Sequence, residues 1–103
     1  MVIDARFDEQ IHAPTRLRVC GLLRPVDTAE FSMLRSALEL SEANLSKTLR
    51  SLTEIGYVRV TKASSASRGD QRRTTAVALT SEGRQAFDGH IAALRRIAGD
   101  LDS

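Results

Sequence analysis

Residues 41–60, SEANLSKTLRSLTEIGYVRV, restrict the fold most strongly, because they join a short amphipathic helix directly to a strand. Ser41 is suited to cap the helix, and the apolar positions that follow it form one stripe at helical spacing. That stripe consists of Leu45, Leu49, Leu52 and Ile55. Gly56 is typical of the residue that ends a helix, and YVRV then alternates as a half-buried strand does. We therefore predict a helix over residues 41–55 that passes through a glycine turn into a strand.

Two further helices are predicted before this stretch. Pro14 suits the first turn of a helix that follows a short leading helix, and Pro25 ends it. Asp27 and Glu30 have the spacing of a capping box ahead of FSMLRSALEL, whose apolar residues recur at helical spacing. The helix over 41–55 would then be the second of two successive helices.

The second half of the chain predicts a hairpin and a last helix. TTAVALT has the alternation of a strand, with Val77 and Leu79 on one face. Between the two strands, ASSASRGDQRR (residues 63–73) has nothing larger than alanine to bury, which indicates an exposed loop. Thr80 or Ser81 is placed to cap a helix from about Glu82 to Ala98. The fold class is therefore mainly α with a small β-hairpin.

Size and composition are those of one domain over residues 1–103. The chain has 103 residues and 42% apolar composition, enough for one core and too little for two. No signal peptide and no membrane-spanning run is evident, so we expect a cytoplasmic protein. The single cysteine, Cys20, lies in the apolar segment RLRVCGLL and is interpreted as a small buried residue rather than a reactive thiol.

Positive charge is concentrated around the helix over 41–55. Residues 41–80 hold seven Lys and Arg against three acids, a net charge of +4. Residues 1–40 and 81–103 each have a net charge of −1, with five against six and three against four. Such an asymmetry favours a polyanionic partner for that part of the surface.

The chemistry of the predicted helix agrees with binding to double-stranded DNA. A helix fits the major groove, which is about 12 Å wide, and a basic loop beside it can reach the neighbouring backbone or minor groove. Asn44 suits adenine, Lys47 and Arg50 suit guanine or phosphate, and Ser41 and Ser46 suit phosphate oxygens. Their arrangement on one face, joined to an arginine-bearing loop, favours a DNA-binding surface over an ordinary solvated one.

The order of motifs also resembles a known family. The segments FDEQIHAPTRLRVCGLL, FSMLRSALELSEANLSKTLRSLTEIGYVRVTK and LTSEGRQAF resemble the winged-helix transcriptional regulators related to the MarR and ArsR groups, and most closely their small single-domain branch. The resemblance covers about residues 7–90. It implies a winged helix-turn-helix fold, a homodimer joined through terminal helices, and DNA binding by the helix at 41–55 and the loop at 63–73. The chain departs from the family at the wing, where SSASRGDQRRT replaces a compact basic run.

The candidate DNA-contacting residues combine the predicted helix with the wing, whose Arg72, Arg73 and Thr74 are assigned by the resemblance. The full set is Ser41, Ala43, Asn44, Ser46, Lys47, Arg50, Lys62, Arg68, Arg72, Arg73 and Thr74.

The last helix carries an apolar seam with spacings of four, three, four and three, as in a coiled coil. The seam consists of Phe87, Ile91, Leu94, Ala98 and Leu101. Two interpretations stay open, because the helix can fold back on its own domain or meet its copy in a dimer, and both can hold along different parts of it.

Other classes of function are less well supported by the residues. No nucleotide-binding glycine loop, HExxH, paired-cysteine motif or nucleophile elbow is present, so we expect no enzymatic activity and no cofactor. For a metal- or redox-responsive regulator, the only soft ligands are His12, Cys20 and His90, and none share metal-site spacing. A metal site would need residues from two subunits or carboxylates such as Asp88, and His12 is expected to bond a backbone group near Pro14. A winged helix used only for protein contacts is the other alternative. An effector of unknown identity would bind at the dimer interface or near the last helix.

Overall fold

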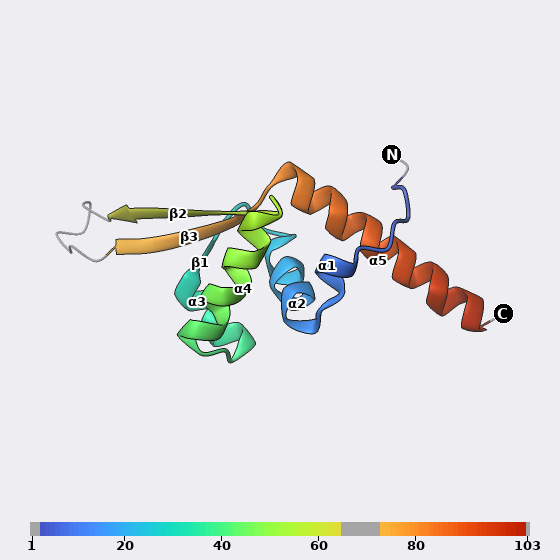
Figure 1. Ribbon diagram of the computed structural model, residues 1–103, viewed down its shortest axis with the longest axis horizontal. Helices are drawn as coiled ribbons and strands as arrows, with labels where there is room; N and C mark the ends of the chain where they lie inside the picture. Colours follow the sequence, from blue (N-terminus) through green and yellow to red (C-terminus); the bar gives the residue numbers. More distant parts are fainter. Residues whose placement is uncertain (1–2, 65–72, 103) are drawn as a thin grey trace.

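The computed structural model describes residues 3–64 and 73–102. Helices α2, α3 and α4 pack beside a small sheet, the strands β2 and β3 project to one side, and α5 runs away on the other (Figure 1). The elements in chain order are α1 (Glu9–His12), α2 (Pro14–Leu23), β1 (Ala29–Glu30), α3 (Phe31–Leu38), α4 (Glu42–Glu54), β2 (Val58–Ser64), β3 (Arg73–Leu79) and α5 (Ser81–Asp102). Within the described ranges, no helix combines the length and apolar character needed to cross a membrane.

Local signals in the sequence place the ends of α2 and α4 as predicted. Pro14 occupies the first turn of α2, where a missing N–H costs no hydrogen bond. The Ser41 Oγ accepts the backbone N–H of Asn44 at 3.1 Å, which caps α4. Gly56 follows α4 with a φ of +84°, a left-handed conformation that favours glycine. The helix-glycine-strand prediction for residues 41–60 is therefore confirmed.

The capping box predicted before α3 is wrong. Glu30 is the residue that precedes α3, and no side-chain hydrogen bond caps this helix. Instead, Ala29 and Glu30 are extended and pair antiparallel with Val77 and Ala76 of β3. Because β1 runs directly into α3, the residue at the cap position is Glu30 and not Asp27, so the capping-box spacing does not apply.

The sheet therefore has three antiparallel strands in the order β1-β3-β2 rather than a two-stranded hairpin. Its central ladder is also longer than predicted, because Ala63, Ser64 and Arg73 belong to strands, with Ser64 paired to Arg73. Of the loop predicted over 63–73, the part that remains between the strands, 65–72, lies outside the described residues.

The core lies where α2, α3 and α4 meet the base of the sheet. Its fully or nearly buried members are Val19, Cys20, Leu23, Leu34, Leu38, Leu45, Leu49, Leu52, Val58, Val77 and Leu79. Burial raises the pKa of the Cys20 thiol to about 11, so this residue is a small buried hydrophobic group as predicted. Val60 keeps the alternation of β2 but is 37% exposed on this edge strand, whereas its partner Val77 on the central strand is buried.

The start of α5 is fastened to the end of α4. Of the two candidate caps, Thr80 is used: its Oγ1 accepts the N–H of Gly83 at 3.0 Å and donates to the carbonyl of Gly56 at 2.6 Å. The N–H of Thr80 also donates to the carbonyl of Tyr57 at 3.0 Å. From this joint α5 continues to Asp102, one turn beyond the predicted end at Ala98.

Candidate nucleic-acid interface

The outer face of α4 is a polar surface that the core leaves uncovered. Leu45, Leu49 and Leu52 are buried on the opposite side, which orients the helix. Most of the predicted contact residues here are exposed, namely Ser41, Ala43, Asn44, Lys47 and Arg50, and Ser46 is half-buried. Glu42 and Glu54 stand at the two ends of α4, so its middle is basic. In the described part of the chain, neither Lys47 nor Arg50 forms an ion pair with a carboxylate.

The strands β2 and β3 carry the predicted wing residues away from the helices (Figure 1). Lys62 is exposed on β2, and Thr74 is half-buried on β3 opposite Ala63. Arg73 begins β3, while the predicted contacts Arg68 and Arg72 lie outside the described residues. Lys62 and Thr74 therefore stand on the same projecting ladder, separate from the outer face of α4.

A cleft of about 300 Å³ lies between the start of α2 and one flank of α4. Its polar lining consists of Thr15, Arg16, Asn44, Lys47, Thr48 and Ser51, and Leu40 closes it. Thr15, Arg16, Thr48 and Ser51 were not predicted as site residues. The sequence could have indicated the α4 members of this lining, because positions 44, 47, 48 and 51 recur at helical spacing on one flank. That α2 packs beside this flank could not be inferred from the spacing of residues in the sequence.

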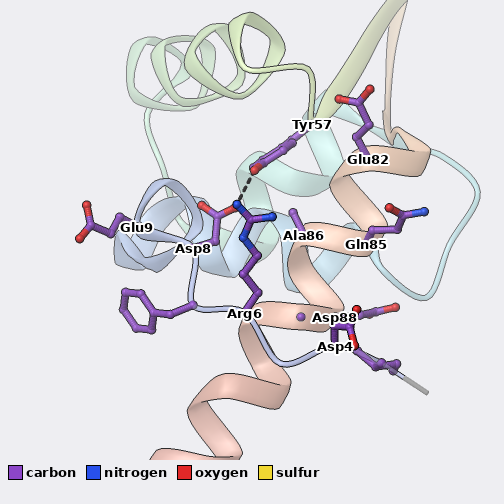
Figure 2. Close-up of a pocket in the computed structure, with 12 residues that line it drawn as sticks. Asp4, Arg6, Asp8, Glu9, Tyr57, Glu82, Gln85, Ala86 and Asp88 are labelled. Atoms are coloured by element: carbon purple, nitrogen blue, oxygen red, sulfur yellow. Dashed lines mark hydrogen bonds between the residues drawn. The ribbon is translucent and has the colours of Figure 1, made fainter.

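A hydrogen-bonded network joins the N-terminal segment to the end of α4. The Asp8 Oδ1 accepts the N–H groups of Gln10 and Ile11 and so caps α1. The Tyr57 hydroxyl donates to the Asp8 Oδ2 at 2.6 Å, as Figure 2 shows. This hydrogen bond, together with burial, raises the pKa of Tyr57 to about 12. The segment before α1 is thereby tied to Tyr57, the residue just before β2.

The network continues into a pair of histidines. The N–H of Asp8 donates to the Nδ1 of His90 at 3.0 Å, and the Nε2 of His90 lies 3.3 Å from the Nδ1 of His12. The Phe7 ring packs against both imidazoles, with ring centroids 4.8 and 4.7 Å away. The predicted bond from His12 to a backbone group near Pro14 is therefore wrong, because α1 turns its His12 toward α5. Among the described residues, no three Cys, His, Asp or Glu side chains are grouped as a metal ion would need.

His90 makes the stability of the fold depend on pH. Its ring is fully buried, and its Nδ1 accepts a hydrogen bond, so the neutral ring fits. Burial, and then the neighbouring His12, lower the pKa of His90 below its ordinary value, and Asp8 opposes this shift. The imidazole of the unfolded chain binds a proton more readily than the buried ring does. The stability that the neutral His90 contributes is therefore fully present above about pH 6.5 and is lost as pH falls through the lowered pKa.

We therefore expect the free energy of unfolding to fall by up to about 1.4 kcal/mol per pH unit in that window. His90→Gln should flatten this slope in urea unfolding series between pH 7.5 and 5. His12→Gln, the control, keeps the buried ring and the larger cause of its lowered pKa, so it should keep most of the slope. An unchanged slope in His90→Gln would assign the pH dependence to other groups.

A second, wider cleft of about 760 Å³ lies between the N-terminal segment and the first half of α5 (Figure 2). Carboxylates dominate its lining, with Asp4, Asp8, Glu9, Glu82 and Asp88 beside Arg6. Asp8 is engaged by Tyr57, and Asp88 accepts two hydrogen bonds from Arg24 at 2.8 and 3.0 Å. That ion pair lowers the pKa of Asp88. The cleft borders the last helix, one of the two places at which an effector was expected.

Comparison with known proteins assigns the family. The family described as the winged helix DNA-binding domain matches residues 15–98, which include α2 without its first residue, α3, α4, both wing strands and most of α5. The chain belongs to this family. The winged-helix domain is 30% identical over 87 residues to an uncharacterized protein of Methanocaldococcus jannaschii, covering 84% of this chain and 90% of the relative.

Solved structures agree with this assignment. A transcriptional regulator homologue from Pyrococcus horikoshii OT3 superposes with a TM-score of 0.84 at 26% identity, covering 93% of this chain and 91% of that one. The regulator ytfH from Salmonella typhimurium, 22% identical with a TM-score of 0.69 over 91% of this chain and 80% of its own, shares the fold. The resemblance to MarR-type regulators is confirmed, and the winged-helix domain is a DNA-binding transcriptional regulator.

The seam predicted on α5 is only partly used within the winged-helix domain. His90 and Ala93, on a neighbouring side of the helix, are buried against the domain, whereas Phe87, Ile91 and Leu94 are half-buried. Ala98 is exposed, and the side chain of Leu101 lies outside the described ones. Ile97, which was not predicted, is 50% exposed. The second half of α5 projects past α1 and away from the other elements (Figure 1).

Proposed function

We propose that the domain is a homodimeric regulator that binds a specific, near-palindromic DNA duplex. The outer face of α4 enters the major groove, and the wing contacts the backbone or minor groove alongside. The observation that carries this proposal is the exposed polar face of α4, with a basic middle that no described carboxylate neutralises. Arg50 and Asn44 supply the paired donors and acceptors that base edges require.

The wing is assigned to the sequence-independent part of binding. Lys62, Arg73 and Thr74 lie on the strands that project from the helices, and Arg68 and Arg72 belong to the part of the sequence that joins these strands. Cations there are suited to phosphates, which position a protein on DNA without selecting sequence. Ser41 and Ser46, at the first half of α4, are assigned to the same kind of contact.

The dimer is proposed to form through α5. Its second half has few neighbours in its own chain, and Ile97 and Ala98 are exposed there. An isolated helix of that length is marginal in water unless an apolar side is covered, and a second copy supplies such a cover. A two-fold dimer would place its two copies of α4 in successive major grooves, roughly 34 Å apart.

Selection from random duplex DNA by the purified protein, with solution mass measured on the same sample, tests the proposal. We expect enrichment of a near-palindrome with half-sites about one helical turn apart. The solution mass should be twice the chain mass of 11.3 kDa. Enrichment of an asymmetric site by a monomer would contradict the dimer and leave specific binding intact.

Absence of any enriched sequence, with binding lost at about 0.15 M salt, would contradict specific recognition. That result would favour a winged helix used for protein contacts. The raised pKa of Cys20 keeps this thiol protonated at neutral pH, which supports a role in packing over redox sensing. The cleft between the N-terminal segment and α5 is the place at which we propose an effector to bind.

A further inference from the structure

The cleft between α2 and α4 has the chemistry of an anion site. Two of its lining residues are cations, Arg16 and Lys47, and the residues that line it include no carboxylate. The hydroxyl of Ser51 and the amide of Asn44 add neutral donors from α4. Thr48 differs from them, because its hydroxyl already donates to the carbonyl of Asn44 at 2.9 Å. A site of this kind stabilises a negatively charged group rather than an apolar or cationic one.

Arg16 is held in place without being neutralised. Its Nη1 donates to the side-chain Oε1 of Gln10 at 2.9 Å and to the Gln10 carbonyl at 3.3 Å. Both acceptors are uncharged, so they orient the guanidinium and leave its positive charge in place. Within the described residues the Nε and Nη2 groups make no hydrogen bond, and these are the donors that bind phosphate in pairs.

The cleft also lies where a DNA backbone would pass. Lys47 belongs both to the cleft and to the exposed face of α4 that carries Arg50. A helix in the major groove has a phosphate backbone on each side of it. In Figure 1 the wing strands and α2 stand on opposite sides of α4. The wing can therefore meet one backbone while the cleft meets the other.

The geometry points to this cleft as the binding site of one DNA backbone phosphate, which Arg16 and Lys47 contact. This phosphate lies at the edge of the major groove opposite the wing. This inference rests on the proposed function and deepens it, because it adds α2 to the DNA-binding surface. It also assigns Lys47 to a phosphate rather than to a base. The position of α4 in the major groove is then fixed by phosphate contacts on both sides, from the wing and from this cleft.

Charge-removing variants on α2 test the inference with the duplex selected above. Arg16→Gln keeps a long polar side chain and should weaken binding about 3- to 10-fold for operator and unrelated duplex alike. Arg18→Gln removes the same charge from the same helix but from a residue outside the cleft, and it should stay within about 2-fold of the parent. Thermal unfolding of both variants shows that the fold is kept.

Replacing single phosphates of the operator by neutral methylphosphonates locates the contact. With the parent protein, one position at the groove edge should weaken binding, and with Arg16→Gln the same replacement should have a much smaller effect. Equal effects in both proteins, or equal binding by Arg16→Gln and Arg18→Gln, would overturn the inference while specific recognition stands. Loss of preference at one base pair in Lys47→Gln would overturn the assignment of Lys47. A parent protein that selects no duplex would overturn both the inference and the proposed function.

Discussion

Gly83→Ala is expected to lower the free energy of unfolding by about 3 kcal/mol or more. A Cβ at this position of α5 would overlap the carbonyl oxygen of Tyr57 and stand 2.9 Å from its carbonyl carbon. Backbone atoms cannot turn aside as a flexible side chain does. The start of α5 would have to move away from the turn after α4, which breaks the hydrogen bonds of Thr80 to Gly56 and Tyr57.

The matched control is Gly99→Ala in the same helix. A Cβ at Gly99 meets nothing within 4 Å, and alanine is the better helix former by about 0.5–1 kcal/mol. In thermal unfolding, Gly83→Ala should melt roughly 12 °C or more below the parent, and Gly99→Ala at or above it. Equal melting temperatures for Gly83→Ala and the parent would show that the joint between α4 and α5 yields easily.

Arg50→Ala is expected to weaken binding to the selected operator by roughly 1–3 kcal/mol, a loss of about 5- to 150-fold. Arg50 is exposed in the middle of the outer face of α4, where a bidentate contact to guanine is geometrically open to it. Repeating the duplex selection with the variant should show relaxed preference at one base pair of each half-site. Affinity for unrelated duplex should change much less.

Two further variants separate charge from base recognition at this position. Arg50→Lys keeps the charge and loses the planar pair of donors, so it should keep general affinity and lose the preference. Arg95→Ala removes one positive charge from an exposed position on α5, outside both α4 and the wing strands, and should bind like the parent. If Arg50→Ala kept both fold and affinity, Arg50 would be removed from the DNA-contacting set.

The parts of the fold that sequence reasoning predicted are those decided by neighbouring residues. Ser41 and Gly56 define the ends of α4 through hydrogen bonds and backbone conformations local to each, and the leucine stripe orients it. These signals need no knowledge of the rest of the chain. The exposed face of α4 followed from them directly, and it is the part of the candidate site that the structure shows in full.

The errors arose where distant segments meet. Asp27 and Glu30 have the right spacing for a cap, but Glu30 pairs with Ala76 across the sheet, which no local pattern reveals. His12 and His90 are separated by 78 positions along the chain and contact each other only because α1 packs on α5. The cleft that joins Arg16 to α4 was missed for the same reason.

The two hydrogen bonds of the Thr80 hydroxyl connect α4 and α5 rigidly at an angle. Its Oγ1 bonds both Gly56 and Gly83, and Gly83 packs closely against the backbone of Tyr57. We therefore expect the angle between the two helices to change little. In a dimer joined through the far ends of α5, a small change in the angle between the two copies of α5 would therefore displace each copy of α4. The distance between the two half-sites that the protein accepts would then be set at the dimer contact, far from any base.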